Sequence, residues 1–288
     1  MATDTRTSTQ TTAAPEPPAI RLDAVSVRLG DRLALHDIDL SIASGSFVGL
    51  IGPNGSGKST LLRSVLGILP LARGSVEVDG RPPGEARDLL AYLPQRQQIE
   101  MDLPLRAWDV VMMGRLRHTG WLRPSSRHDK EVVAWALERV GLVDRRYSSI
   151  GEMSFGQQQR VFFARSLAQE GRIILLDEPM NGVDSQTEAL FTELLTFFHG
   201  EGKTLVMATH DLNQAAAICD NVCILNQSLV AYGPVEQTLT EDVLQRAFGL
   251  HLHFVHGEGD APSHVDHVLE DVHHHDTHSE GRRRGRLG

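Results

Sequence analysis

The sequence predicts an α/β fold in which a parallel-type sheet carries the functional loops, with an antiparallel β-subdomain at its N-terminal side and an inserted α-helical subdomain. Two observations lead to this prediction. Short apolar segments alternate with amphipathic segments between residues 173 and 225, which is typical of a parallel sheet covered by helices. A glycine-rich loop also joins an apolar strand at 47–51 to a segment whose leucines have helical spacing.

The N-terminal part of the domain is predicted to form strands. Apolar and polar residues alternate at 20–25 and 35–40, which predicts antiparallel strands ahead of the buried strand at 47–51. Further strands are predicted at 75–79 and 89–93, because turns that contain Gly and Pro separate these segments.

The pattern becomes helical after residue 106, and we place a helical subdomain at about 96–170. Strand and helix then alternate again. The predicted strands lie at 173–176, 204–208 and 222–225, and the predicted helices lie at 185–199, 212–218 and 242–248. The whole domain is therefore expected to span residues 20–250.

Both ends of the chain differ in composition from this domain. Residues 1–19 are rich in Thr, Ala and Pro, which predicts a disordered N-terminal tail. Nine of the 14 histidines lie between residues 251 and 278 among acidic residues, so 251–288 is predicted to be a second, His-rich and disordered tail.

Composition also excludes several classes of function. The net charge of −9 argues against a nucleic-acid-binding surface. No run approaches about 18 apolar residues and no charged-then-apolar segment opens the chain, so we expect neither a membrane span nor a secretion signal. The two cysteines, Cys219 and Cys223, form no C-x-x-C pair and are expected to be buried, reduced thiols.

The glycine-rich loop fits the G-x-x-x-x-G-K-[ST] pattern of a phosphate-binding loop. Glycines let backbone N–H groups wrap a polyphosphate, and the positive end of the next helix points at the same anion. Lys58 would reach the β- and γ-phosphates, and the Ser59 hydroxyl would hold Mg²⁺. The predicted nucleotide-binding residues are Gly52, Pro53, Asn54, Gly55, Ser56, Gly57, Lys58, Ser59 and Thr60.

Two adjacent carboxylates, Asp177 and Glu178, end the apolar strand that begins at 173. Parallel sheets bind ligands at the carboxyl ends of their strands. Asp177 suits the acid that anchors Mg²⁺, and Glu178 is placed to take a proton from water. An ordinary Asp-Glu turn is the alternative interpretation.

Polar residues follow two other predicted strands. His210 ends one of them, and its imidazole can bond a γ-phosphate and hold the attacking water. Gln95 follows the strand at 89–93, where a neutral amide can touch Mg²⁺ or the water without adding charge. Taken alone, a strand-end His is more often structural and a Gln more often lies at the surface.

A third motif begins at Ser154, which forms a capping box with Gln157 and so opens a helix. A helix start with a hydroxyl and free N–H groups is a second phosphate-binding end. The residues by themselves leave open the alternative of a plain capped helix.

Together these motifs resemble the ABC ATPases. The phosphate loop, Gln95, the segment 153–157, Asp177 with Glu178, the segment 181–184 and His210 are similar, in that order, to the Walker A, Q-loop, signature, Walker B, D-loop and H-loop motifs of the family. The resemblance covers about residues 20–250 and implies a P-loop NTPase core that hydrolyses ATP with Mg²⁺.

The resemblance also implies a head-to-tail dimer of two copies with ATP at the interface. Ser154 and Gly156 of one copy would contact the γ-phosphate held by Lys58 of the other, with Gln157 also among the nucleotide-binding residues. Asp184 would lie across the interface near the attacking water. No nucleic acid is expected as a partner.

Two positions depart from the family pattern. Phe155 replaces the first glycine of L-S-G-G-Q; as the first helical residue it needs only a negative φ, but crowding at the interface should weaken closure driven by ATP. Leu29 lies where the family carries an aromatic residue that stacks on adenine, and leucine offers apolar contact without a π face.

Segments at 92–96, 102–105, 109–114 and 120–124 are similar to the branch of the family that serves zinc, manganese or iron uptake. This resemblance implies integral-membrane permease subunits, an extracytoplasmic metal-binding protein and a position at the cytoplasmic face of the membrane. Import of metal chelates (siderophore, haem or cobalamin) is the alternative within the family, and a soluble ABC ATPase without a transport role is the alternative outside it.

The His-rich tail is a separate candidate for metal binding. Its imidazoles alternate with carboxylates, a mixture that suits Zn²⁺ or a similar ion in a loose, variable geometry. A solvated tail without metal is the alternative. The candidate ligands are His264, His267, His273, His274, His275 and His278.

Overall fold

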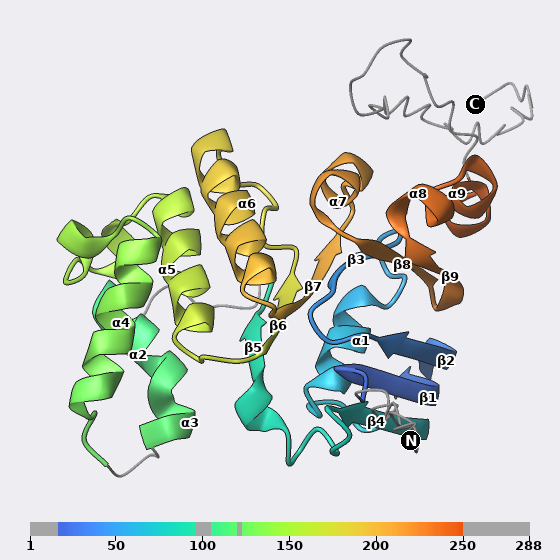
Figure 1. Ribbon diagram of the computed structural model, residues 1–288, viewed down its shortest axis with the longest axis horizontal. Helices are drawn as coiled ribbons and strands as arrows, with labels where there is room; N and C mark the ends of the chain where they lie inside the picture. The colour runs from blue at the N-terminus through green and yellow to red at the C-terminus, as the bar shows by residue number, and fades with distance from the viewer. Residues whose placement is uncertain (1–16, 96–104, 120–122, 250–288) are drawn as a thin grey trace, which may run out of the picture.

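The computed structural model describes residues 17–95, 105–119 and 123–249 (Figure 1). Residues 1–16 of the predicted N-terminal tail (1–19) and the whole predicted C-terminal tail (251–288) therefore lie outside the described residues. Ala19 is described and is only 2% exposed, and its carbonyl accepts a hydrogen bond of 3.0 Å from the N–H of Asp79. Ala19 thus packs with the first sheet, directly before the domain start expected at residue 20.

An antiparallel sheet forms the N-terminal subdomain, as predicted. Its strand order is β2-β1-β4. Ile20 lies opposite both Ile42 and Val78, so the apolar faces of the three strands coincide. Its strands are β1 (Ile20–Leu29), β2 (Arg32–Ile42) and β4 (Arg73–Val78).

The main sheet is six-stranded with the order β5-β6-β7-β3-β8-β9. All neighbours pair in parallel except β9, which pairs antiparallel with β8 and was not predicted. Its strands are β3 (Phe47–Ile51), β5 (Leu90–Leu93), β6 (Ile173–Asp177), β7 (Thr204–Thr209), β8 (Asn221–Asn226) and β9 (Ser228–Pro234).

The predicted helical subdomain forms a group of helices at one end of the molecule (Figure 1). They are α2 (Ala107–Met112), η3 (Met113–Arg115), α3 (Leu116–Thr119), α4 (Arg127–Arg139), η4 (Val143–Arg145), η5 (Ile150–Glu152) and α5 (Phe155–Leu167). The other helices are α1 (Lys58–Val65), η1 (Arg87–Leu89), α6 (Ser185–Gly200), α7 (Leu212–Ile218), α8 (Val235–Thr238) and α9 (Glu241–Phe248).

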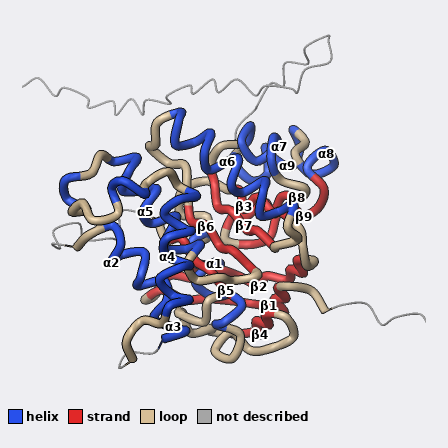
Figure 2. The backbone as a smooth tube through the Cα atoms, turned by 60° about the vertical axis from the view of Figure 1, so that its left-hand side comes forward, coloured by secondary structure: helices blue, strands red, loops and turns tan. Residues whose placement is uncertain are grey.

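Both faces of the main sheet are buried. In β6, Ile174 and Leu176 pack into the core under the helices, whereas Ile173 and Leu175 pack into the core shared with α1 and the antiparallel sheet. Successive residues of a strand point to opposite faces, so a strand covered on both sides becomes apolar throughout. Figure 2 shows α4 and α5 apart from β1, β2 and β4, with β5 and β6 of the main sheet between these two groups.

The strand register brings several carboxyl ends to one edge of the sheet. Leu93 pairs with Leu176, Asp177 pairs with Ala208, and Ile51 pairs with Thr209. The residues that follow β5, β6, β7 and β3 therefore emerge side by side, and these are the segments in which the sequence predicted functional residues.

Two further predictions concern the cysteines and the membrane. Cys219 and Cys223 are free and buried, as predicted, and burial raises the pKa of each thiol to about 12. Within the described parts of the chain, no helix has the length and apolar character needed to cross a membrane.

Candidate functional site

The glycine-rich loop joins β3 to the start of α1, as predicted. Gly55 and Gly57 adopt φ values of 78° and 104°, a region that favours glycine. A Cβ at Gly57 would lie 2.5 Å from Leu35 Cδ2, so a larger residue would displace the loop from β2. Gly57 is the N-cap of α1 and no side chain caps this helix start, which leaves its N–H groups for an anion.

Lys58 bends back over the loop. Its Nζ donates hydrogen bonds to the carbonyls of Gly52 (2.7 Å) and Pro53 (3.2 Å). Burial lowers the pKa of Lys58, while the nearby carboxylates of Glu178 and Asp177 raise it. The ammonium group is therefore held at the centre of the loop, with negative charge on one side.

Ser56 provides a test of whether the loop fits a polyphosphate. Its hydroxyl oxygen is buried and has no hydrogen-bond partner among the residues that the structure describes. Leaving a buried polar group unpaired costs about 1–3 kcal/mol. A phosphate oxygen in the loop would satisfy this hydroxyl, so the loop fits the ligand that its sequence predicts.

Ser59 and Asp177 form the predicted pair of oxygen ligands. The Ser59 hydroxyl donates to Asp177 Oδ1 at 2.9 Å, and the Tyr92 hydroxyl donates to Oδ2 at 3.4 Å. Burial raises the pKa of Asp177, and the hydrogen bond from Ser59 partly opposes this rise. Hydroxyl and carboxylate oxygens are ligands that Mg²⁺ accepts, so this pair fits a bound magnesium ion.

The sequence did not predict Tyr92 as a separate site residue. Burial and the nearby Asp177 raise the pKa of its phenol to about 12, so the phenol acts as a hydrogen-bond donor. Tyr92 pairs with Leu175, two residues before Asp177, which places the tyrosine diagonally across from the carboxylate. Only the pairing of β5 with β6 reveals this neighbour.

Glu178 directly follows β6 in an unusual backbone conformation, with φ of 50°. Its N–H donates to the Ala208 carbonyl at 3.0 Å. Gln95 Nε2 donates to Glu178 Oε2 at 2.7 Å, so two residues that the sequence assigned to catalysis are in direct contact. Asn181 Nδ2 donates to the same oxygen at 2.9 Å. Sequence reasoning placed Asn181 in a motif but gave it no role.

The start of α5 is the capped helix that the sequence predicted. The Ser154 hydroxyl accepts from the N–H of Gln157 at 3.3 Å, and Gln157 Oε1 accepts from the N–H of Ser154 at 3.1 Å. Phe155 is the first helical residue, as predicted, and is 41% exposed. Its ring lies 3.6 Å from the position that a Cβ at Gly182 would take, so it covers the loop before α6.

Asp184 caps the N-terminus of α6 in this chain. It accepts hydrogen bonds from the N–H of Thr187 (2.9 Å) and the Thr187 hydroxyl (3.1 Å). These bonds lower the pKa of Asp184, and the bond from the Thr187 N–H contributes most. A Cβ at Gly156 would collide with the Asp184 carboxylate, so glycine is required for the close approach of α5 and α6.

The remaining predicted site residues lie at the periphery. His210 follows β7 and is exposed, and Leu29 ends β1 with 46% of its surface exposed. Arg32, which lies opposite Leu29 in the β1–β2 register, was not predicted. Its Nη2 lies 3.7 Å from the position that a Cβ at Gly55 would take, so a guanidinium borders the phosphate loop.

Residues 35–181 match the family model described as ABC transporter, which is more than half of the chain. The chain belongs to the ABC transporter family. This ABC protein is 40% identical to the manganese transport system ATP-binding protein MntB of Listeria innocua over 230 residues, which cover 80% of the chain and 96% of MntB. It is 41% identical to the zinc transport system ATP-binding protein TroB of Treponema pallidum over 231 residues, which cover 80% and 87% of the two proteins.

A solved structure described as an inward-facing conformation of a putative metal-chelate type ABC transporter superposes on this ABC protein with a TM-score of 0.73. The two chains are 26% identical, and the alignment covers 84% of this chain and 94% of the other. The resemblance and the α/β fold class expected from the sequence are thereby confirmed. Family membership implies that the phosphate loop binds ATP with Mg²⁺. It also implies that the chain dimerises and that its partner is a membrane permease.

Proposed function

We propose that this ABC protein binds and hydrolyses ATP in order to power import of a metal ion (zinc, manganese or iron) through a membrane permease. The observation that carries the catalytic part is the convergence of Lys58, the Ser59–Asp177 pair and Glu178 at one edge of the sheet. A cation, a metal-binding oxygen pair and a carboxylate base are the parts that phosphoryl transfer to water requires.

Each of these residues has a distinct task. Lys58 binds the β- and γ-phosphate oxygens of ATP, and Ser59 and Asp177 would hold Mg²⁺, which when bound neutralises charge on the phosphates. Glu178 accepts a proton from the attacking water, and Gln95 orients the Glu178 carboxylate through their 2.7 Å hydrogen bond. We expect His210, which follows the neighbouring strand β7, to hold the water and the γ-phosphate.

The second half of the site comes from another copy of the chain. The exposed start of α5 offers the Ser154 hydroxyl and the positive end of the helix dipole, which suit the γ-phosphate held by Lys58 of the second copy. Gly156 and Gln157 belong to the same first turn, and Asp184 caps α6 beside Gly156. Ser154 and Asp184 are both exposed at these neighbouring helix starts, which supports the head-to-tail dimer.

Substitution of Glu178 tests the catalytic assignment. Purified chain with its natural permease should release inorganic phosphate from Mg-ATP, and Glu178→Gln should lower turnover about 10²- to 10⁴-fold while ATP binding persists. Glu193→Gln, at an exposed position on α6, is the matched control and should keep the wild-type rate. Turnover that Glu178→Gln leaves unchanged would disprove the assignment.

A groove of about 740 Å³ beside the helical subdomain supports the transport part of the proposal. It lies between the end of α1, β5 and the segment η3–α3, and exposed apolar side chains of Ile68, Met113 and Leu116 line it. Arg87 and Arg117 add positive charge. We infer that an amphipathic cytoplasmic helix of the permease, apolar on one face and acidic at its margin, docks in this groove.

Charge reversal tests this docking surface. Arg87→Glu should weaken co-purification with the permease and leave ATP hydrolysis by the isolated chain unchanged, because Arg87 is exposed and distant in sequence from the phosphate loop. Arg127→Glu is the control, since Arg127 is exposed on α4 and does not line the groove. Equal loss of both activities in Arg87→Glu would contradict the assignment.

The metal substrate is inferred from the relatives, whose names refer to manganese and zinc transport. A second candidate, import of a metal chelate, is favoured by the metal-chelate type transporter that shares the fold. Cells that lack this chain should lose uptake of radiolabelled Mn²⁺ or Zn²⁺ if the first candidate holds. Loss of ferric siderophore or cobalamin uptake alone would favour the second. A role outside transport is not favoured by these relatives.

The six histidines proposed as tail ligands lie outside the described residues. Within the described ranges, no group of three or more His, Cys, Asp or Glu side chains is arranged to hold a metal ion. We propose that the tail binds Zn²⁺ loosely and so senses the metal near the transporter. Calorimetry should show less Zn²⁺ uptake by a chain that ends near residue 256 than by the full chain, and equal uptake would refute the proposal.

A further inference from the structure

The carboxylate of Glu178 is held by two side-chain amides that come from different parts of the fold. Gln95 lies just after β5, and Asn181 lies in the loop between β6 and α6. Both donate to Oε2, at 2.7 Å and 2.9 Å. Among the residues that the structure describes, Oε1 accepts no hydrogen bond and is left for another donor.

The backbone alone does not determine where this carboxylate points. Glu178 has φ of 50°, and its N–H bonds to Ala208, so its Cα is anchored to β7. The side chain beyond it has several rotatable bonds, and an unrestrained glutamate samples many rotamers. The two amide donors select one orientation of the carboxylate. Oε2 accepts their hydrogen bonds, and Oε1 is left for another donor.

The loop that carries Asn181 also contacts the other half of the site. Gly182, with φ of 71°, lies under the ring of Phe155 at the start of α5, and Asp184 two residues later caps α6 beside Gly156. The side chain of Asn181 therefore links the Glu178 carboxylate of this chain to the loop beside Ser154. This loop reaches the surface at which the second copy is expected. A shift of the loop would therefore move Asn181 and, through its hydrogen bond, the Glu178 carboxylate.

We propose that Asn181 is a positioning residue for Glu178, which fixes the carboxylate through Oε2 so that Oε1 faces the attacking water. This inference rests on the proposed ATP hydrolysis and deepens it. An amide suits the task because its N–H group donates to a carboxylate without adding charge. Among the described residues, an alanine would leave Gln95 as the one remaining donor, and an aspartate would place a second negative charge beside the base.

The test compares Asn181→Ala with Asn226→Ala in the full-length chain with its permease. Asn226 is a matched control because its Nδ2 also donates one hydrogen bond, at 3.0 Å, but to the Ala247 carbonyl of α9. Asn181→Ala should lower kcat about 10- to 100-fold, since a misplacement near 1 Å costs about 10²-fold. KM and the ATP affinity measured by calorimetry should stay within about twofold of the wild-type values. Asn226→Ala should keep the wild-type kcat and KM.

A double substitution distinguishes positioning from a general structural role. If Asn181 acts through the Glu178 carboxylate, Asn181→Ala should change the residual rate of Glu178→Gln by less than about twofold. An Asn181→Ala effect of the same size in both backgrounds, or a wild-type kcat in the single variant, would overturn the inference. Absence of phosphate release by the wild-type complex would instead refute the proposed function, so the two failures are distinguishable.

Discussion

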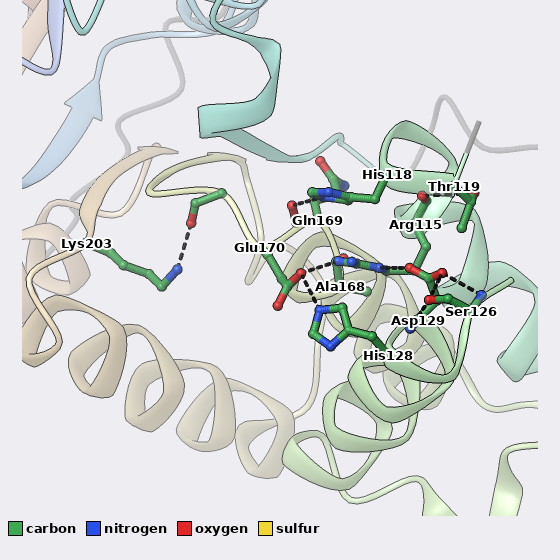
Figure 3. A network of polar contacts seen from close by, with 11 residues as sticks. Arg115, His118, Thr119, Ser126, His128, Asp129, Ala168, Gln169, Glu170 and Lys203 are labelled. Carbon is green, nitrogen blue, oxygen red and sulfur yellow. Dashed lines mark hydrogen bonds and ion pairs between the residues drawn. The ribbon is translucent and has the colours of Figure 1, made fainter.

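Replacement of Arg115 with methionine should destabilise the domain by about 3 kcal/mol, because this arginine is buried and links α4 to the segment that leads from α5 into β6. Figure 3 shows its contacts: Nε donates to Asp129 Oδ1 at 2.9 Å, and Nη1 donates to Glu170 Oε2 at 2.6 Å and to the Ala168 carbonyl at 2.7 Å. The three acceptors belong to α4 and to the segment that leads from α5 into β6.

The magnitude follows from the burial of each partner. The side chains of Arg115 and Asp129 are 2% and 5% exposed, and removal of one partner from a buried ion pair costs about 3–5 kcal/mol. Glu170 is 41% exposed and contributes little. Ser126 still donates two hydrogen bonds to Asp129, from its N–H and its hydroxyl, which favours the lower end of this range. In a domain of this size, about 3 kcal/mol lowers Tm by about 6–12 °C.

Urea unfolding and thermal unfolding of the full-length chain measure the loss. Arg127→Met is the matched control, because Arg127 forms the same kind of bond with Glu131 on α4 but is 93% exposed, and the cost should be about 0.3–0.5 kcal/mol. Arg115→Met combined with Asp129→Asn should recover part of the loss, since no unpaired charge is then buried. A loss below about 1 kcal/mol in Arg115→Met would refute the reasoning.

Three further predictions concern acid stability, closure and nucleotide choice. Burial raises the pKa of Asp129, but hydrogen bonds from Ser126 and Arg115 outweigh this and lower it to about 2. Because the folded-state pKa lies below the unfolded value of about 3.9, the ionised Asp129 carboxylate stabilises the fold above pH 4, and this contribution is lost as the pH falls toward 2. Urea unfolding at several pH values measures the change in the free energy of unfolding. If Asp129→Asn shows the same pH slope as the wild type, the prediction is wrong. Phe155→Gly should strengthen ATP-driven dimerisation measured by light scattering, and an unchanged dimer fraction together with unchanged hydrolysis would show that Phe155 does not crowd the interface. Leu29→Tyr should tighten ATP binding about two- to tenfold and increase the preference for ATP over GTP in calorimetry, since an aromatic pair adds about 0.5–1.5 kcal/mol; equal affinities would exclude adenine stacking there.

Much of the fold was predictable because its signals are local. The strand at 47–51, the glycine turn after it and the helical segment that follows are consecutive in the chain, and the structure has them in this order, with α1 beginning at Lys58. The capping box from Ser154 to Gln157 is likewise a contact over three residues. By contrast, β9 was missed because its residues are almost all partly buried and show no alternation.

Contacts between distant segments could not be predicted in the same way. Gln95 and Glu178 were each assigned to catalysis, but their hydrogen bond spans 83 residues and depends on the pairing of β5 with β6. Arg115 directly follows the segment 109–114, and no local pattern predicts that it is among the largest fully buried side chains of the described residues. Sequence periodicity places a side chain on a face of an element, but it does not say which other element covers that face.

The sequence by itself therefore determined the phosphate loop, the order of the motifs and the alternation of strands and helices, because each depends on residues within a few positions of one another. The tertiary structure alone decided that Tyr92 reaches Asp177, that Gln95 and Asn181 share one oxygen of Glu178, and that the ring of Phe155 covers Gly182. These contacts arise from strand register and helix packing, and a shift of a single residue in the register would point the side chains to the opposite face of the sheet.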